Sequence, residues 1–178
     1  MHRLFVALRP PGNIRDQLLR LTAGVESARW QDDDQLHLTL RFIGDVPRMQ
    51  AEEVAAELAR VRQEPFTLRL RGAGHFMRKG TPSALWVGVV PCPALEVLQG
   101  RVERACRRAG LPSERRKFLP HVTLARLNRS AGPIGGWLAA HGDFSSDSWM
   151  VNELVLFESH LTPHGAHYEA AVSYTLEP

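Results

Sequence analysis

The feature that most constrains the fold is an order of segments that occurs twice along the chain. In each copy a compact apolar run comes first, apolar residues at spacings of three and four follow, and an alternating run ends the unit. These segments lie at 3–8, 11–28 and 36–43 in the first copy and at 84–90, 95–106 and 121–127 in the second. Such patterns are typical of a strand, an amphipathic helix and a half-buried strand. The sequence therefore predicts a duplicated strand–helix–strand unit.

Further elements are expected between and after the two copies. Their patterns predict a helix at 49–63, a strand at 67–71, a glycine-rich loop at 72–80, a short helix at 133–141, and antiparallel strands at 150–158 and 167–176 joined by a turn at 162–165. No low-complexity linker divides the chain. We therefore expect one domain over residues 1–178, in which two lobes bring the alternating strands together across a central groove.

Composition indicates an ordinary globular protein. Apolar residues make up 44% and charged residues 23% of the 178 residues, which is usual for soluble domains. No apolar run approaches the roughly 18 residues of a membrane span, and the first residues lack the features of a signal peptide. Cys92 and Cys106 are too few for a disulfide scaffold. We therefore expect two reduced thiols and a cytoplasmic protein.

The basic residues are mostly arginine. Of the 22 basic residues only Lys79 and Lys117 are lysines, and the formal net charge is +3. Arginine binds phosphate oxygens with two parallel hydrogen bonds, which favours a polyanionic partner. A genome-wide preference for arginine would give the same composition without any function behind it. The run Arg115-Arg116-Lys117 also has two interpretations, which the sequence favours equally. It is a contact for RNA phosphates or a solvated loop.

The two alternating segments share the pattern His-x-Thr-x. It reads His37-Leu38-Thr39-Leu40 in the first copy and His121-Val122-Thr123-Leu124 in the second. Because side chains alternate along a strand, each histidine and its threonine point to one face, and the apolar residues point to a core. Two such strands facing each other would place two imidazoles and two hydroxyls around one space.

That set of groups suits phosphoryl transfer without a metal ion. One imidazole can take a proton while the other, as imidazolium, protonates the leaving oxygen, because an ordinary histidine pKa of about 6.5 populates both forms. Such acid–base help contributes about 10²–10⁴ in rate. The threonine hydroxyls can donate hydrogen bonds to non-bridging phosphate oxygens. We therefore predict four catalytic residues, with no metal and no cofactor: His37, Thr39, His121 and Thr123.

A third His-x-Thr, His160-Leu161-Thr162, shows that spacing alone is a weak signal. Pro163 follows it directly, so we expect this copy at the beginning of a turn, off any strand face and outside the active site. His160, His164 and His167 also invite a zinc site. Zinc ligands usually include Cys or carboxylate residues at firm spacing, which argues against a metal here.

Three aromatic residues are candidates for stacking a nucleobase, as in proteins that bind single strands. They are Phe76, Trp86 and Phe118. Trp86, on an apolar strand, is more typical of a core residue.

Longer stretches around the three copies resemble a known family. The paired motifs are similar to the signature of the two-histidine (2H) phosphoesterases, and their surroundings resemble the bacterial and archaeal RNA 2',3'-cyclic phosphodiesterases, also named 2'-5' RNA ligases. The stretches are His37-Leu-Thr-Leu-Arg-Phe-Ile-Gly-Asp-Val46, Phe118-Leu-Pro-His-Val-Thr-Leu-Ala-Arg126 and Glu158-Ser-His-Leu-Thr-Pro-His-Gly-Ala-His-Tyr168. The similarity runs from Leu4 to about Tyr168. It implies a bilobal α+β fold with two antiparallel sheets that face a central cleft.

The resemblance also implies an activity. A terminal 2',3'-cyclic phosphate of RNA would be hydrolysed to a 2'-phosphate, with His37 as proton donor to the 3'-oxygen and His121 as the base that activates water. This division of roles comes from the family, because the two motifs are nearly interchangeable in sequence. Thr39 and Thr123 would hold the phosphate, and Arg126 matches a substrate-binding arginine usual in the family. The expected partners are RNA ends with a cyclic phosphate, bound by a monomer that spans no membrane.

Strict alternation is at odds with the role of Arg126, because it points this side chain to the face opposite His121 and Thr123. Either the strand ends or bulges near Ala125, or Arg126 supports the site from behind. By the same alternation Arg41 shares a face with the histidine of the first motif, or it reaches solvent.

Other functions remain open. A non-catalytic RNA- or nucleotide-binding module would keep the cleft, although intact His and Thr in both motifs argue against it. A two-histidine enzyme acting on a small cyclic nucleotide would keep the same residues. Reversible 2'-5' RNA ligation would keep them too, because it is the microscopic reverse of the hydrolysis.

Overall fold

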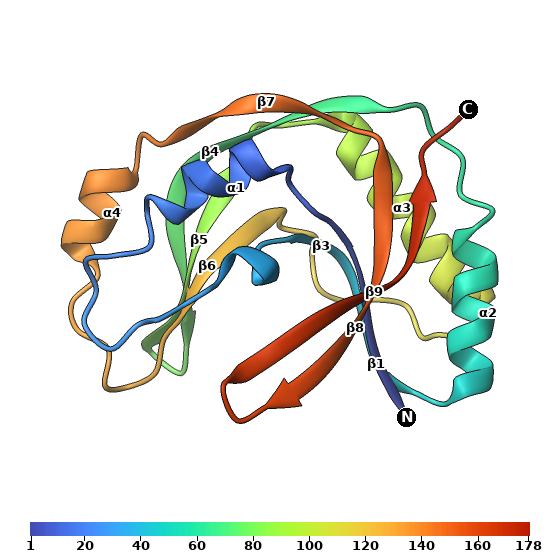
Figure 1. Ribbon diagram of the computed structural model, residues 1–178, viewed down its shortest axis with the longest axis horizontal. Helices are drawn as coiled ribbons and strands as arrows, with labels where there is room; N and C mark the ends of the chain where they lie inside the picture. Colours follow the sequence, from blue (N-terminus) through green and yellow to red (C-terminus); the bar gives the residue numbers. More distant parts are fainter.

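The computed structural model describes residues 1–178 and has a mixed α+β architecture (Figure 1). In chain order the elements are β1 (His2–Leu8), α1 (Gly12–Leu19), β2 (Arg29–Trp30), the 3-10 helix η1 (Asp33–Gln35), β3 (Leu38–Val46), α2 (Arg48–Leu58), β4 (Phe66–Arg78), β5 (Thr81–Val89), α3 (Pro93–Arg108), β6 (His121–Arg126), α4 (Gly135–His141), β7 (Ser145–Val151), β8 (Glu153–Thr162) and β9 (Gly165–Thr175). The predicted α+β class is confirmed. None of the helices has the length and hydropathy that crossing a membrane requires.

The strands form one hydrogen-bonded path in the order β7-β4-β5-β6-β3-β1-β8-β9, with β2 beside β6. Neighbouring strands are antiparallel throughout. The path narrows at one place, because β3 and β6 share only the pair Leu38–Val122. The expectation of two separate facing sheets is not confirmed. Instead, two halves of one sheet meet at the two strands that carry the His-x-Thr motifs.

The helices lie on the halves of the sheet in a crossed arrangement (Figure 1). Helix α1 follows β1 in the chain but packs against β7, and α3 follows β5 but packs against β3. Helix α2 lies beside α3, and α4 lies against β4. The helix of each sequence copy therefore covers the half of the sheet to which the other copy's strands belong, and both halves contribute to one core cluster of 35 buried residues.

The motif strands are anchored in that core by their apolar residues. Leu38, Leu40, Val122 and Leu124 are all at most 3% exposed, which confirms that they point away from the face of the histidines. A smaller buried cluster lies on the face that carries the histidines, in the half of the sheet that contains β1 and β8. Its members are Phe5, Ala7, Val155 and Phe157, with Tyr168 packed against them.

Two predicted helices end earlier than their patterns indicate. The helix expected at 11–28 stops at Leu19, whose carbonyl accepts a 2.6 Å hydrogen bond from the Thr22 hydroxyl. Leu21 and Val25 are nevertheless buried, so their apolar spacing reflects core contacts without a helix. The helix expected at 49–63 likewise ends early, with α2.

Most of the glycine-rich segment 72–80 is not a loop, because β4 continues through it to Arg78 and only Lys79 and Gly80 form a turn. The pairing of β4 with β5 shifts between Leu70 and Ala73, where Gly72 has a φ of +77°. This left-handed residue lets the strand change register and then resume pairing, which is a position that favours glycine. Glycine here marks a bulge within a long strand.

The segment 150–158, predicted as one strand, is divided between β7 and β8. The chain changes partners at Asn152, so that β7 pairs with β4 before it and β8 pairs with β1 after it. Strand β8 also runs further than predicted, to Thr162. The turn predicted at 162–165 is confirmed, since β8 and β9 form the hairpin at lower centre in Figure 1.

Candidate active site

The two His-x-Thr motifs lie side by side at the junction between the halves of the sheet. Leu38 pairs with Val122 in antiparallel register, and both are fully buried. Extending that register by one residue sets His37 across from the threonine of the second motif, and His121 across from the threonine of the first. The structure therefore brings the four predicted residues together on one face of the sheet.

Both imidazoles are held in the same way. Nδ1 of His37 donates a 2.7 Å hydrogen bond to the Gln35 carbonyl, and Nδ1 of His121 donates a 2.6 Å bond to the Leu119 carbonyl. Because a carbonyl oxygen can only accept, each neutral ring carries its proton on Nδ1. Nε2 then has a free lone pair in the neutral ring and a proton to give in the charged ring.

His37 is enclosed by aromatic side chains. Its ring centroid lies 4.8 Å from that of Phe5 and 5.2 Å from that of Tyr168, which meets it edge-on. Burial lowers the pKa of His37 to about 4, although the hydrogen bond to the Gln35 carbonyl opposes this shift. The positive charges of Arg126 and His121 lower the pKa of His37 further. The free protein therefore holds this imidazole neutral at neutral pH.

His121 lies in a similar but more open setting. Phe76 meets its ring edge-on at 4.8 Å, and Trp86 lies 6.2 Å away. Burial is the main cause that lowers the pKa of His121, and the charge of Arg126 adds to it. A bound phosphate anion would favour the charged form of either ring and raise its pKa again.

Arg126 shares the face of the histidines because β6 bulges. Trp86 pairs with Thr123 and Leu85 pairs with Ala125, so β6 has one more residue than β5 over this interval. The extra residue reverses the alternation that follows it. The effect of the Arg126 charge on the pKa of both histidines fits a guanidinium close to both rings. Of the alternatives left open by the sequence, the structure has the bulge.

Strand β3 has the matching bulge, with the opposite result for its arginine. Val6 pairs with Arg41 and Ala7 pairs with Thr39, so Leu40 is the extra residue. Arg41 is consequently turned into the protein and only 7% exposed. The expectations that it shares the face of the first histidine or reaches solvent are both wrong.

Phe42 takes the motif face instead. It pairs with Phe5, which contacts His37, and antiparallel partners point to the same side. Arg3 lies over its ring, with the guanidinium carbon 5.2 Å from the ring centroid. Phe42 follows the first histidine by five residues, as Arg126 follows the second. The two halves thus present an aromatic ring and a guanidinium at equivalent positions.

A cavity of about 330 Å³ opens beside His121. It is lined by Arg71, Phe76, Trp86, Gly88, Val89, Leu119, Pro120 and His121. The Trp86 indole lies directly on Gly74, where a Cβ atom would come within 2.4 Å of the ring. The two glycines at 74 and 88 therefore make room for a tryptophan that lies flat on the sheet and forms a wall of the cavity.

The third His-x-Thr lies on a strand, contrary to expectation, because β8 extends to Thr162. His160 is 3.3 Å from the Glu169 carboxylate and stacks on His167, both across the hairpin. The Thr162 hydroxyl donates to the Gly165 carbonyl of the turn. These residues satisfy one another within the hairpin, and no third metal-binding side chain joins His160 and Glu169.

The basic run before the second motif and its aromatic neighbour are less free than the sequence indicates. Arg116 is bound to the Glu114 carboxylate, at 3.2 Å for its closest ion-pair contact, so it is engaged within the protein. Arg115 and Lys117 are exposed. Phe118 packs against the main core.

The backbone carbonyls of Gln35 and Leu119, which hold the two imidazole rings, could not be predicted from the sequence. Every residue has a backbone carbonyl, so no residue type indicates which ones act as acceptors.

The antiparallel sheet and its crossed helices bring two imidazoles together at the junction between the halves of the sheet. A family model described as the 2'-5' RNA ligase superfamily matches residues 10–162. This chain belongs to that superfamily.

Curated relatives are similar over most of the chain. An RNA 2',3'-cyclic phosphodiesterase of Aeropyrum pernix is 38% identical over 78% of this chain and 80% of its own. A protein of the same name from Escherichia coli is 34% identical over 70% of this chain and 71% of its own.

Solved structures share the whole fold. Escherichia coli LigT, in a crystal structure with 3'-AMP, superposes with a TM-score of 0.82 at 28% identity, over 99% of both chains. A Thermus thermophilus protein, TT0787, superposes with a TM-score of 0.80 at 26% identity, over 98% of this chain and 97% of its own. The fold expected from the sequence resemblance is thereby confirmed in its class.

Proposed function

We propose that this protein hydrolyses terminal 2',3'-cyclic phosphates of RNA, with His37 and His121 as an acid–base pair. The observation that carries the proposal is the matched pair of rings, each with Nδ1 bound to a backbone carbonyl two residues earlier. Nε2 of both rings makes no hydrogen bond within the protein, so both are available to a substrate. The relatives named RNA 2',3'-cyclic phosphodiesterase support the same reaction.

In the proposed reaction His121 takes a proton from water at Nε2 as the water oxygen attacks phosphorus. The bond between phosphorus and the 3'-oxygen breaks, and His37 gives its Nε2 proton to that oxygen. The product has a 2'-phosphate and a free 3'-hydroxyl, and one water molecule has been added. The two rings exchange protonation states, and solvent restores them afterwards.

The acid role of His37 is supported by its surroundings. A strongly buried imidazolium has a low pKa and gives up its proton readily, which suits protonation of a poor leaving alkoxide. The negative phosphate supplies the charge that lets this ring become protonated when substrate binds. His121 is more open, which suits a base that must reach water.

We propose Thr39, Thr123 and Arg126 as the groups that bind the phosphate. The threonine hydroxyls donate to non-bridging oxygens, and the guanidinium of Arg126 neutralises the charge that grows in the transition state. The cavity beside His121 is proposed to accept a nucleobase, because Phe76 and Trp86 offer aromatic surfaces and base–aromatic stacking tolerates any base.

We further propose that the protein works as a monomer in the cytoplasm and needs no metal ion. Both cysteines are free in the structure, as expected for a reducing compartment. With two imidazoles assigned to the proton transfers, the reaction has no step that calls for a metal-bound water.

The test is incubation with an oligonucleotide that ends in a 2',3'-cyclic phosphate, followed by mapping of the phosphate in the product. We expect conversion to a 2'-phosphate. Tight binding of the oligonucleotide without turnover would support the non-catalytic binding module instead. Turnover of small cyclic nucleotides alone would assign the same site to a different substrate.

A further inference from the structure

The segment 112–120 leads the chain from helix α3 into the second motif without regular structure. None of its backbone groups forms a hydrogen bond with another backbone group. Four of them bind side chains instead. These are the Pro112 carbonyl, the Glu114 and Arg116 N–H groups, and the Leu119 carbonyl. The last one is the acceptor that fixes the His121 ring, so the position of this ring depends on how the segment is held.

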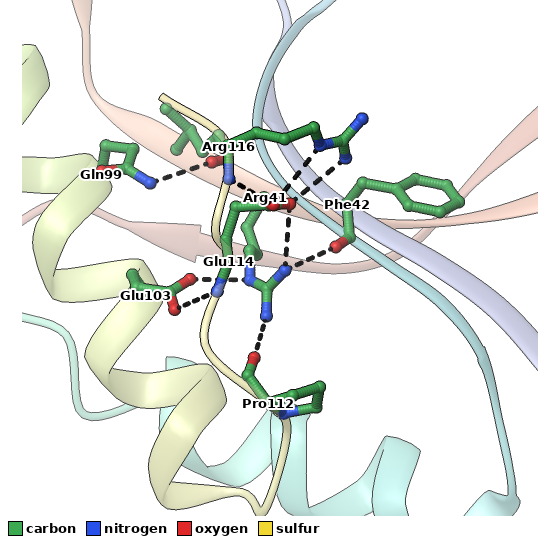
Figure 2. Close-up of polar contacts among 8 residues, drawn as sticks. Arg41, Phe42, Gln99, Glu103, Pro112, Glu114 and Arg116 are labelled. Atoms are coloured by element: carbon green, nitrogen blue, oxygen red, sulfur yellow. Dashed lines mark hydrogen bonds and ion pairs between the residues drawn. The ribbon is translucent and has the colours of Figure 1, made fainter. Parts of the chain in front are cut away.

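Arg41 of β3 holds the beginning of the segment (Figure 2). Its Nη2 donates a 2.5 Å hydrogen bond to the Pro112 carbonyl, and Nη1 donates to the Phe42 carbonyl at 3.1 Å. Nε lies 2.7 Å from Glu103 Oε2 of helix α3. These two atoms are not aligned for a hydrogen bond, so their attraction is that of an ion pair. Nη1 also lies 3.4 Å from Glu114 Oε2.

The carboxylates of Glu103 and Glu114 bind further backbone groups of the segment (Figure 2). Glu103 accepts a 2.9 Å hydrogen bond from the Glu114 N–H, and Glu114 accepts one of 2.9 Å from the Arg116 N–H. The hydrogen bonds from Arg116 are the main cause that lowers the pKa of Glu114 to about 2. Glu114 is therefore charged at any working pH. Every backbone bond of the segment, apart from the one to His121, belongs to the network around Arg41.

We infer that Arg41 is a positioning residue for His121, acting through the segment 112–120. Arg41 lies on β3, four residues after His37, which directly precedes this strand. One guanidinium therefore ties the strand that follows the first histidine to the segment that carries the acceptor of the second. The sheet itself joins the two halves only at Leu38–Val122. The Arg41 network is thus a second connection that sets the separation of the two rings. This inference rests on the proposed function, in which His121 is a reacting group.

A purely structural role would have different consequences. Removal of one partner from a buried ion pair lowers stability wherever the pair lies. Loss of a positioning contact also frees the Leu119 carbonyl to shift, which weakens its bond to His121 Nδ1. The first histidine is unaffected, because its acceptor Gln35 lies in η1 and is bound separately to the hairpin through Ala166. His37 therefore serves as an internal reference within the same molecule.

The decisive variant is Glu114→Gln, which removes charge but little volume from a residue that is 23% exposed. Its matched control is Glu57→Gln. Glu57 is also largely buried and binds two arginines, Arg60 at 2.6 Å and Arg108 at 2.7 Å, but it bonds to no atom of the segment. Arg41→Lys is a second variant, which keeps the charge and loses the forked geometry that reaches Pro112 and Glu114 together.

The measurements are imidazole ¹H–¹⁵N NMR spectra, with kcat and KM on an oligonucleotide ending in a 2',3'-cyclic phosphate at a temperature where all variants are folded. For Glu114→Gln and Arg41→Lys we expect the His121 Nδ1–H signal to weaken or shift while the His37 signal stays. We also expect kcat to fall by about 10-fold or more, toward the roughly 10²-fold cost of a 1 Å misplacement, with KM little changed. Glu57→Gln should leave both histidine signals and kcat as in the wild type.

An unchanged His121 signal in Glu114→Gln and Arg41→Lys would overturn the inference, and so would equal changes in Glu57→Gln. Failure of the proposed function would look different, because the wild type itself would then turn over no substrate. In that case the NMR spectra alone would decide whether Arg41 sets the His121 ring.

Discussion

Leu38 and Val122 form the one residue pair that joins β3 to β6, and each lies between a histidine and a threonine. The proposed reacting groups therefore sit at the narrowest point of the sheet. Each side of the pair has its own carbonyl acceptor for Nδ1 and its own bulge after the threonine. The pseudo-symmetry ends beyond the bulges, where one half offers Arg126 and the other Phe42.

Removing either proposed acid or base should be far more costly than removing the hairpin histidine. We expect His37→Ala and His121→Ala each to lower kcat by at least about 10²-fold, the low end for a missing proton-transfer group. His160→Ala should keep most activity, because Glu169 and His167, with which His160 forms its ion pair and its ring contact, belong to its own hairpin. Steady-state kinetics of the three variants test this. Comparable losses for His160 and His37 would remove the basis for assigning the site to two motifs.

Activity should not depend on a metal ion. If both proton transfers belong to imidazoles, saturating EDTA should leave the rate of cyclic phosphate hydrolysis unchanged. The rate before and after chelation measures this directly. A collapse that added Zn²⁺ or Mn²⁺ restores would show that a metal site had been misjudged.

Arg126 should act on both histidines at once. Its charge lowers the pKa of His37 and of His121, so Arg126→Gln should raise both values in an NMR titration of the free protein. The same variant should lower kcat by about 10²-fold, as for loss of one donor to a developing anion. Arg129→Gln is the control, since Arg129 is exposed on the loop after β6. Unchanged histidine titrations in Arg126→Gln would place its guanidinium away from the rings.

Burial of neutral His37 should make stability depend on pH in a defined window. The folded pKa is about 4 against an ordinary 6.5, so the unfolded chain binds more protons between these values. The contribution of His37 is complete above about pH 6.5 and is lost as the pH falls toward 4. Thermal unfolding of the wild type should therefore show a Tm that drops over this range, and His37→Gln should flatten the drop. Parallel curves for the two proteins would argue against a buried neutral imidazole.

The Arg41 network should lose stability at a lower pH than the His37 site, so it does not interfere with the test of His37. The pKa of Glu114 is lowered from an ordinary 4.5 to about 2. Its contribution to stability is present above pH 4.5 and is lost as the pH falls through 2.

Much of the site follows from the sequence because strand alternation is a strong physical rule. His37 and Thr39 share a face, as do His121 and Thr123, since Leu38 and Val122 between them must be buried. The rule fails one step later, where both strands bulge. No residue type after Thr39 or Thr123 indicates that the strand has a bulge there. The bulge of β6 therefore brings Arg126 to the face of the histidines, and the bulge of β3 turns Arg41 into the core.

The fold was predictable in its elements but not in its assembly. Apolar spacing places α3 correctly, yet it does not tell which half of the sheet the helix covers. The carboxylates Glu103 and Glu114 come near Arg41 only because α3 crosses to β3. The glycines of β4 are equally ambiguous in sequence, since Gly74 serves the close approach of Trp86 and not a turn.

The most direct test of the division of labour compares the two histidine variants on a substrate whose 3' leaving group needs no proton. If His37 is the acid and His121 the base, this substrate should restore activity to His37→Ala and leave His121→Ala inactive, while the wild type yields only a 2'-phosphate from an RNA end. Restoration of His121→Ala instead would reverse the roles within the same site. A 3'-phosphate product from the wild type would contradict the proposed geometry itself.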